Sequence, residues 1–288
     1  MDLRPFIKND SQRETAKELV KRGLFNYQPF IFADDLQTGV GLEFMIDHEG
    51  NGLVYWPTIP NELLKSPEMK RFIIDNSDAK SFIEANERLR AAYDGFINEI
   101  CGRVTDIRQF TFADMGCNSG YFPVNFSLRG ARLSVGYDRQ DYSESFSLLN
   151  DILKTNAVFQ NNYYNGSRSF MEEHKKYDVA ISMMVLCHLS DPLNYLSFLG
   201  NISKKMIFIW TLVTDDDDYT IRFGEPNKYY KNDIFPFCFD NMVRPSLKLI
   251  YKSLELMGFT EIYELPNKGG FPEVFHNVRN KAILAIKP

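Results

Sequence analysis

The chain has 288 residues, of which 44% are hydrophobic, and a formal net charge of −5. This length and apolar content suffice for one large domain with its own core. The negative charge provides no long-range attraction to nucleic acids or to anionic membranes. The four cysteines and four histidines are scattered, without a Cys-x-x-Cys pair, so we expect no metal site and no disulfide framework.

The beginning of the chain, MDLRPFIKNDSQRE, lacks the apolar core of a signal peptide. The longest apolar run, MIFIWTLV, is far too short to span a bilayer. These features, with the scattered cysteines, predict a cytoplasmic protein that has no membrane partner. They leave its oligomeric state open.

The first hundred residues show neither an internal repeat nor a low-complexity linker. The segment PFIFADDLQTGVGLEF, residues 29–44, indicates short strands and turns. Apolar residues at helical spacing predict a helix from Asp78 to about Ile100. We expect residues 1–105 to form a cap that packs on the main domain, residues 106–288, and encloses the substrate.

From residue 110 onward, strand-like and helix-like segments alternate. The strand-like runs are residues 110–115, 133–138, 157–160, 178–183 and 205–213. Helix-like stretches such as FPVNFSLR, SESFSLLNDILKTN and PLNYLSFLGNI lie between them. This alternation predicts βαβ units in a parallel sheet, and right-handed crossovers make that sheet doubly wound.

A long connection, the loop insertion 214–243, interrupts this rhythm, and its acidic run Asp215–Asp218 predicts a solubilising turn. A helix is then expected to begin at Pro245. The segments TEIYELP and KAILAIKP predict a closing antiparallel pair at the sheet edge. The predicted fold is α/β, with a doubly wound, mostly parallel, seven-stranded Rossmann-like sheet and an N-terminal cap segment.

The segment FADMGCNSGYF, residues 112–122, places two glycines directly after a strand. Gly116 and Gly120 have no Cβ, so a ligand can approach the turn, and the next helix offers free N–H groups. A dinucleotide-binding turn would read Gly-x-Gly-x-x-Gly and would hold a pyrophosphate. This turn reads Asp-x-Gly-x-x-x-Gly instead. The carboxylate of Asp114 would repel pyrophosphate but attract an ammonium group.

ADMGCNSGYF resembles motif I of the class I S-adenosylmethionine-dependent methyltransferases. The resemblance implies that Asp114, Gly116 and Gly120 hold the methionine end of that cofactor, with Cys117 and Asn118 in the same binding turn. Asn118 departs from the family pattern, which more often has glycine there. Asparagine tolerates unusual backbone angles, so the departure is minor.

Two further segments follow the same family pattern. Asp138 ends the run SVGYD, and the resemblance implies that it accepts both ribose hydroxyls; a helix-capping aspartate is the alternative. After the next strand, Asn162 resembles by position the residue at the adenine edge, and Tyr163 could lie against the ring.

The segment YDVAISMMVLCHLSDPLNYL resembles the family's fourth strand and the turn after it. The resemblance implies that Met183 lies at the carboxyl edge of the sheet, beside the sulfonium, where its backbone could contact the cofactor. The side chain of Met183 fits plain core equally well. His188 could act as a general base, or it could support the start of a helix.

These resemblances imply an S-adenosylmethionine-dependent methyltransferase that works by in-line displacement. DDLQTG and PSLKLIYKSLELMGF loosely resemble the tRNA wobble-uridine carboxymethyltransferase subgroup. Two alternatives stay open, namely transfer of a methyl or carboxymethyl group to tRNA, and a non-catalytic interaction protein that binds the cofactor.

A small polar organic acceptor is favoured over tRNA because the sequence pI is about 5.5 and no Lys/Arg run exceeds two residues. Aromatic residues in segments 25–60 and 214–240 are expected to enclose that acceptor. These residues are Tyr55, Trp56, Tyr229, Tyr230, Phe235, Phe237 and Phe239.

Overall fold

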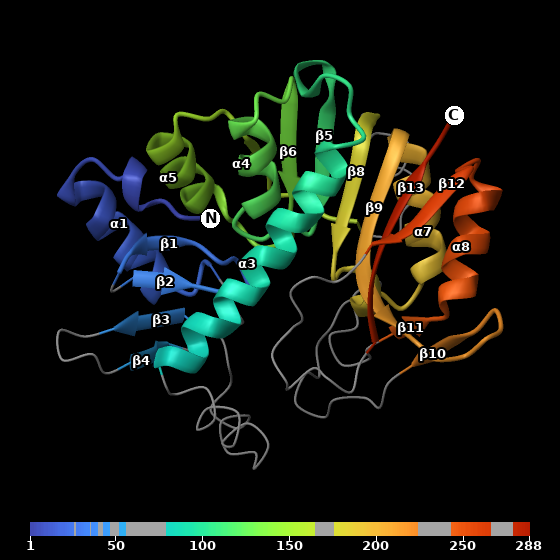
Figure 1. The fold of residues 1–288 in the computed structure, drawn as a ribbon, viewed down its shortest axis with the longest axis horizontal. Coiled ribbons are helices and arrows are strands. Elements are labelled where there is room, and N and C mark those ends of the chain that lie inside the picture. Colours follow the sequence, from blue (N-terminus) through green and yellow to red (C-terminus); the bar gives the residue numbers. More distant parts are fainter. Residues whose placement is uncertain are drawn as a thin grey trace, which may run out of the picture.

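A seven-stranded sheet forms the centre of the molecule, as the computed structural model shows (Figure 1). The structure describes residues 1–25, 27–34, 36–39, 43–46, 52–55, 79–164, 176–223, 243–265 and 279–288. In chain order the strands of this sheet are β5 (Thr111–Met115), β6 (Leu133–Tyr137), β7 (Val158–Gln160), β8 (Tyr177–Met183), β9 (Ser203–Val213), β12 (Glu261–Leu265) and β13 (Arg279–Ile286).

The strand order is β12-β13-β9-β8-β5-β6-β7. Strands β9, β8, β5, β6 and β7 run parallel, whereas β13 pairs antiparallel with both β9 and β12. The prediction of a mostly parallel seven-stranded sheet with a closing antiparallel pair is therefore confirmed. The order reverses between β5 and β8, because the chain moves outward to β7 and then returns to the other side of β5.

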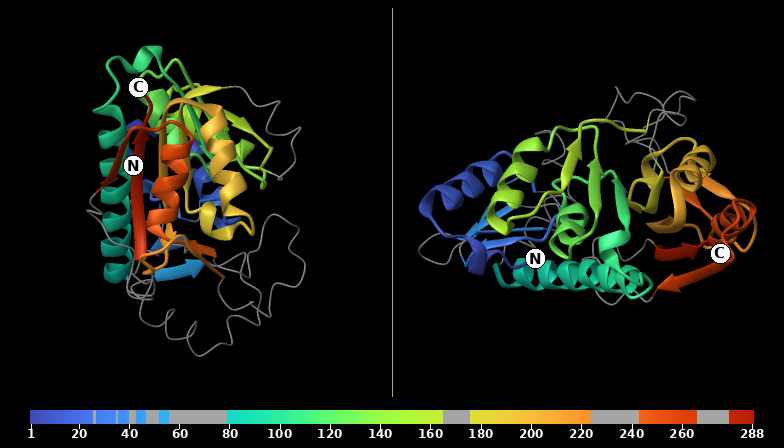
Figure 2. Two further views of the ribbon diagram at one scale, coloured as in Figure 1. Left: turned by 90° about the vertical axis from the view of Figure 1, so that its right-hand side faces the viewer. Right: turned by 90° about the horizontal axis from the view of Figure 1, so that it is seen from above.

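Helices cover both faces of this sheet, so the doubly wound prediction is also confirmed. The helices α3 (Ala79–Cys101), α4 (Tyr121–Leu128) and α5 (Ser143–Leu153) share one hydrophobic cluster. The helices α7 (Pro192–Ile202) and α8 (Leu247–Leu256) belong to the cluster on the opposite face (Figure 2). Successive strand residues divide between the clusters, with Phe112 in the first and Ala113 in the second.

The connection after β9 differs from the sequence prediction at two points. Helix α8 begins after Ser246, whose Oγ accepts a hydrogen bond from Leu249 N at 3.1 Å. Pro245 instead ends the strand β11 (Val243–Pro245), which pairs antiparallel with β10 (Ile221–Phe223). Ser246 is the N-cap of α8 because its hydroxyl accepts a hydrogen bond from a backbone N–H that has no partner within the helix.

The acidic run also has a structural role in addition to solvation. The carboxylate of Asp216 accepts hydrogen bonds from Thr214 Oγ1 at 3.1 Å, Thr220 Oγ1 at 3.0 Å and Arg222 Nε at 2.6 Å. One acid of the run therefore organises the turn that leads from β9 into β10.

The N-terminal segment contains the 3-10 helix η1 (Arg4–Phe6) and the helix α1 (Asp10–Lys21). A four-stranded antiparallel sheet follows, made of β1 (Ile31–Ala33), β2 (Leu36–Thr38), β3 (Glu43–Ile46) and β4 (Gly52–Tyr55). Among the residues that the structure describes, no helix is long and apolar enough to cross a membrane.

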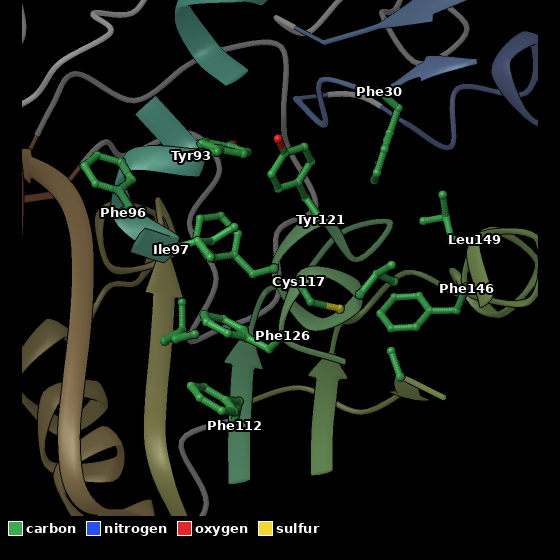
Figure 3. Packing of buried hydrophobic residues seen from close by; sticks show 14 of the residues in the cluster. Phe30, Tyr93, Phe96, Ile97, Phe112, Cys117, Tyr121, Phe126, Phe146 and Leu149 are labelled. Atoms are coloured by element: carbon green, nitrogen blue, oxygen red, sulfur yellow. The ribbon is translucent and has the colours of Figure 1, made fainter. Parts of the chain in front are cut away.

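Aromatic rings join this segment to the main sheet. The Tyr121 ring of α4 lies 5.2 Å from that of Phe30 and 5.1 Å from that of Tyr93, centroid to centroid (Figure 3). Residues of both parts therefore form one continuous core. That residues 1–105 enclose a substrate stays a prediction. Of the rings expected around that substrate, Tyr55 ends β4, and the others lie outside the described residues.

Phe96 tests whether the N-terminal helix α3 is integral to this core. Its side chain is 2% exposed, and its ring lies 5.1 Å from Phe208 and 5.3 Å from Trp210 on β9. Phe96→Ala should lower the free energy of unfolding by about 3–5 kcal/mol, within one cooperative transition. Urea unfolding followed by circular dichroism and by tryptophan fluorescence measures both quantities. A loss below about 1 kcal/mol, or two separate transitions, would contradict the shared core.

Candidate functional site

The reversal in strand order locates the candidate site at the carboxyl ends of β5 and β8. Connections leave these two neighbouring strands in opposite directions, and open α/β sheets bind their ligands at such a switch point. The turn of residues 116–120 follows β5, and residues 184–188 follow β8. The structure thus brings these two predicted site segments to one edge.

Left-handed backbone marks both turns. Gly116, Asn118 and Gly120 have φ angles of 79°, 50° and 95°, and Met184, in the neighbouring turn, has a φ of 56°. This conformation costs conformational free energy in residues other than glycine. It persists where the surrounding structure enforces it, and it is frequent at functional sites. The unusual residue Asn118 therefore fits its position, as the sequence predicted.

Hydrogen bonds tie these turns to the adjacent strands. The amides of Gly116 and Cys117 both donate to Tyr137 O of β6, at 2.8 and 3.0 Å. The amide of Met184 donates to Trp210 O of β9 at 2.7 Å. The turns are thereby fixed relative to each other through the sheet.

The glycines of the first turn have neighbours that a Cβ would strike. A Cβ on Gly116 would lie 2.3 Å from Val185 Cγ2, and one on Gly120 would lie 2.5 Å from the Phe146 ring. Protein side chains thus occupy the space of each missing Cβ, and the predicted close approach of a ligand stays a prediction. Cys117 is buried, its Sγ donates to Asn118 O at 3.3 Å, and its carbonyl accepts from Gly120 N at 3.0 Å, so its role as a cofactor contact stays a prediction.

Asp114 is the chemically distinctive group of the site. It is 3% exposed, and its Oδ1 has no hydrogen-bond partner among the described residues. Burial, and then the charge of Asp138, raise the pKa of Asp114 well above its ordinary value. A buried carboxylate without a partner is costly, and a positively charged hydrogen-bond donor would remove that cost. The residue therefore fits the ammonium group expected of the cofactor.

Asp138 lies beside the same turn. Its Oδ2 accepts from Asn118 N at 2.8 Å, and its Oδ1 accepts from Gln140 N at 3.0 Å. Burial raises the pKa of Asp138, although these backbone hydrogen bonds oppose the rise. Each oxygen keeps a second lone pair that can accept a hydroxyl. Asp138 does not cap α5, since it is Asp141 whose side chain accepts from Ser143 N.

The predicted adenine contacts lie next along the same edge. Asn162 is exposed, and its side-chain oxygen accepts from Tyr163 N at 2.9 Å, while Tyr163 is half-buried. The neighbouring Asn161 donates instead to Arg139 O at 3.0 Å and to Asp138 O at 3.4 Å. Sequence reasoning missed this role of Asn161, although the adjacent asparagines gave a signal. The adenine contacts stay a prediction.

Met183 and His188 flank the second turn. Met183 is half-buried at the end of β8 and packs against the core. His188 is half-buried in the 3-10 helix η4 (Leu186–His188). Burial would raise the pKa of the adjacent Cys187 thiol, but the charge and hydrogen bond of His188 bring it below its ordinary value. The Cys187 thiol itself donates to Met184 O at 3.3 Å, within the second turn.

Sequence reasoning missed Arg244 in β11. This strand contacts both β9 and η4, so it lies beside the turn that carries His188. The Nε of Arg244 is buried and has no hydrogen-bond partner among the described residues. A single arginine in an irregular connection gives no sequence signal.

A pocket of about 370 Å³ lies away from this site. Lys176, Lys204 and Lys287 contribute to its wall, at the amino ends of β8 and β9. Lys287 Nζ donates to Gly200 O at 3.0 Å and to Ser203 O at 2.9 Å, carbonyls at the C-terminal end of α7. That lysine is therefore explained by helix capping, and the helix end disfavours an anion there.

Comparison with known families gives one match that covers half of the chain. Residues 85–233 match the family model described as a methyltransferase domain. This range begins within α3 and includes both turns of the candidate site.

Curated relatives share parts of the sequence. The chain is 29% identical over 116 residues to a tRNA U34 carboxymethyltransferase of Campylobacter hominis, covering 39% of this chain and 40% of that protein. It is 27% identical over 168 residues to the tRNA U34 carboxymethyltransferase of Campylobacter jejuni, covering 57% of this chain and 54% of that protein. The chain thus spans about half the length of the curated relatives that it matches.

Solved structures resemble the chain more distantly. One is the magnesium protoporphyrin IX methyltransferase of Synechocystis PCC 6803 with bound S-adenosylmethionine. It shows a TM-score of 0.49 and 13% identity, over 79% of this chain and 94% of that one.

The unpaired carboxylate of Asp114 leads to a stability prediction. Folding raises the pKa of Asp114, so this residue contributes stability when it is protonated. That contribution is complete below the ordinary pKa of about 4, and it is lost as the pH rises through the raised pKa of the folded state. Asp114→Asn should therefore raise the Tm of the ligand-free protein by about 3 °C or more at neutral pH, with the difference vanishing at low pH. Thermal unfolding across the pH range measures this effect.

Asp178 provides a matched control with the opposite sign. Burial would raise its pKa, but two hydrogen bonds to its Oδ2, from Thr111 N at 2.9 Å and Thr111 Oγ1 at 2.8 Å, help to lower it overall. Asp178→Asn should therefore destabilise the protein at neutral pH, and this difference should shrink as pH falls through the lowered pKa. If both substitutions lowered Tm at neutral pH, the argument for Asp114 would be wrong.

Proposed function

Because the chain belongs to the family of S-adenosylmethionine-dependent methyltransferases, we propose that it transfers a methyl group to a small polar organic acceptor. The observation that carries the proposal is the pair of left-handed turns at the switch point, one of which follows the buried, unpaired Asp114. An ammonium-bearing ligand satisfies that carboxylate, and a dinucleotide pyrophosphate does not.

The residues of the first turn would hold the cofactor. Asp114 would bind the ammonium group, and Asp138 would accept the ribose hydroxyls with its remaining lone pairs. Gly116, Asn118 and Gly120 would keep the backbone in the shape that these contacts need. When bound, S-adenosylmethionine supplies a methyl group that its sulfonium already activates.

The residues of the second turn would act on the acceptor. Met183 and the following turn would border the methyl group, and the core around them would exclude water. His188 would receive a proton where the acceptor has one to lose. Arg244, with its buried and unpaired Nε, would orient a polar or negatively charged group of the acceptor. Alignment with the methyl–sulfur bond then provides most of the rate enhancement.

Transfer to tRNA is the second candidate, and the relatives favour it. The two Campylobacter proteins are tRNA U34 carboxymethyltransferases, but the chain spans only about half of their length. The net charge of −5 favours the small acceptor, since a polyanion gains no general attraction.

Asp138→Ala tests the cofactor site. Hydrogen bonds to charged groups are worth roughly 1.5–3 kcal/mol each, so the substitution should weaken S-adenosylmethionine about tenfold or more. Titration calorimetry on wild type and variant, both folded by circular dichroism, measures the affinities. Unchanged affinity would refute the ribose contact, and wild type that bound a nicotinamide dinucleotide but not S-adenosylmethionine would refute the proposed function.

A gel-shift titration with bulk tRNA separates the two acceptor classes. The small-acceptor proposal predicts no micromolar complex at either low or moderate salt. Micromolar binding that weakens steeply with salt would reveal a phosphate-contacting surface, because bound cations are released from the nucleic acid. That outcome would replace the small acceptor with tRNA.

A further inference from the structure

The helix that follows the cofactor turn begins without a cap of its own. The N-cap of α4 is Gly120, which has no side chain to accept from the first free N–H groups. The N-terminal amides of a helix need partners when they are buried. Tyr121, the first residue of α4, is fully buried, so its amide requires an acceptor from elsewhere.

Gln28 supplies that acceptor from a distant part of the chain. Its side-chain Oε1 accepts a hydrogen bond from Tyr121 N at 2.8 Å, across 93 positions of sequence. Gln28 is 6% exposed, so water does not replace this contact readily. The bond joins the loop before β1 to the residue directly after Gly120.

The loop around Gln28 is itself firmly held. The carbonyl of Gln28 accepts from Thr38 Oγ1 at 2.6 Å and from Phe30 N at 2.9 Å. The preceding residue, Tyr27, has a left-handed φ of 59°, and its carbonyl accepts from Tyr93 Oη at 3.0 Å. These contacts fix the position of the Gln28 amide before it reaches α4.

We propose that Gln28 is a positioning residue of the cofactor site, contributed by the N-terminal segment. It holds the first turn of α4, and with it Gly120 and the backbone of Asn118, whose amide bonds Asp138 at 2.8 Å. Gln28 acts through that backbone rather than by touching the cofactor. This inference rests on the proposed function, since it assigns a residue to the same S-adenosylmethionine site.

Gln28→Asn is the direct test, because it keeps a buried amide but withdraws it by one methylene. The variant should fold and bind S-adenosylmethionine about tenfold more weakly, the loss expected for a buried donor left unsatisfied. The exchange of the Tyr121 amide with solvent should also become faster. Titration calorimetry and hydrogen exchange followed by NMR measure the two effects.

Gln12→Asn is the matched control within the same segment. Gln12 is also buried, accepts from Lys8 N at 2.9 Å, and donates to Asp151 Oδ2 of α5 at 2.7 Å. The same chemical change there removes similar contacts away from the cofactor turn. It should lower Tm to a similar degree and leave the cofactor affinity within about twofold, as distant sites act independently.

Gln28→Glu should restore the affinity, since a glutamic acid can accept from Tyr121 N with one oxygen and, when protonated, donate to Tyr27 O with the other, as Gln28 Nε2 does at 3.3 Å. Affinity within about threefold of wild type supports positioning through this one acceptor. If Gln28→Asn and Gln12→Asn lost cofactor affinity equally, or if Gln28→Asn kept the affinity of the wild type, the inference about Gln28 would be overturned and the proposed function would stand. A wild-type protein that did not bind S-adenosylmethionine would overturn the proposed function as well.

Discussion

A buried carboxylate that lacks a positive partner is the constraint on which the site depends. Asp114 is the penultimate residue of the interior strand β5, where both sheet faces are covered and water cannot solvate its charge. Its neighbour Asp138 adds repulsion rather than relief. The fold therefore tolerates a destabilising group at the switch point, and a cationic ligand is what can make that group favourable. This is how a stable sheet can carry a binding site.

The rest of the architecture keeps this carboxylate in place. The sheet ties the first turn to β6 and the second to β9, so that the two turns meet at one edge. The N-terminal segment adds its own contacts, since Phe30 and Tyr93 pack on Tyr121 and Gln28 caps its amide. Residues far apart in the sequence thus support one short turn. The same edge carries His188, and β11, which contains Arg244, contacts the 3-10 helix η4 that ends at His188.

Much of the fold could be predicted because its signals are local. Apolar strands of three to eleven residues alternate with helices, and the acid-glycine turn has its own spacing. The prediction that a helix begins at Pro245 was wrong, because proline suits both a first helical turn and an edge strand. The hydroxyl of Ser246 determines where α8 begins. Position alone did not indicate that the side chain of Asn161 donates to Arg139 O.

Other parts of the site could not be predicted, because they depend on long-range contacts. Gln28 and Tyr121 are hydrogen-bonded although they lie 93 positions apart, and no pattern in either segment predicts that contact. The unpaired state of Asp114 depends on the whole surrounding core and not on its neighbours in sequence. Arg244 belongs to the candidate site only through the contact of β11 with η4, which the sequence does not indicate.

Proton release on cofactor binding tests the central claim most directly. Calorimetric titrations with S-adenosylmethionine, in buffers of different ionisation enthalpy at mildly acidic pH, give the number of protons exchanged. If Asp114 is protonated in the free protein and ionised beside the ammonium group, binding should release protons, increasingly as pH falls, and the affinity should weaken in parallel. The release should be absent in Asp114→Asn. Binding that exchanged no protons across this range in the wild type, or equal release in both proteins, would contradict the account.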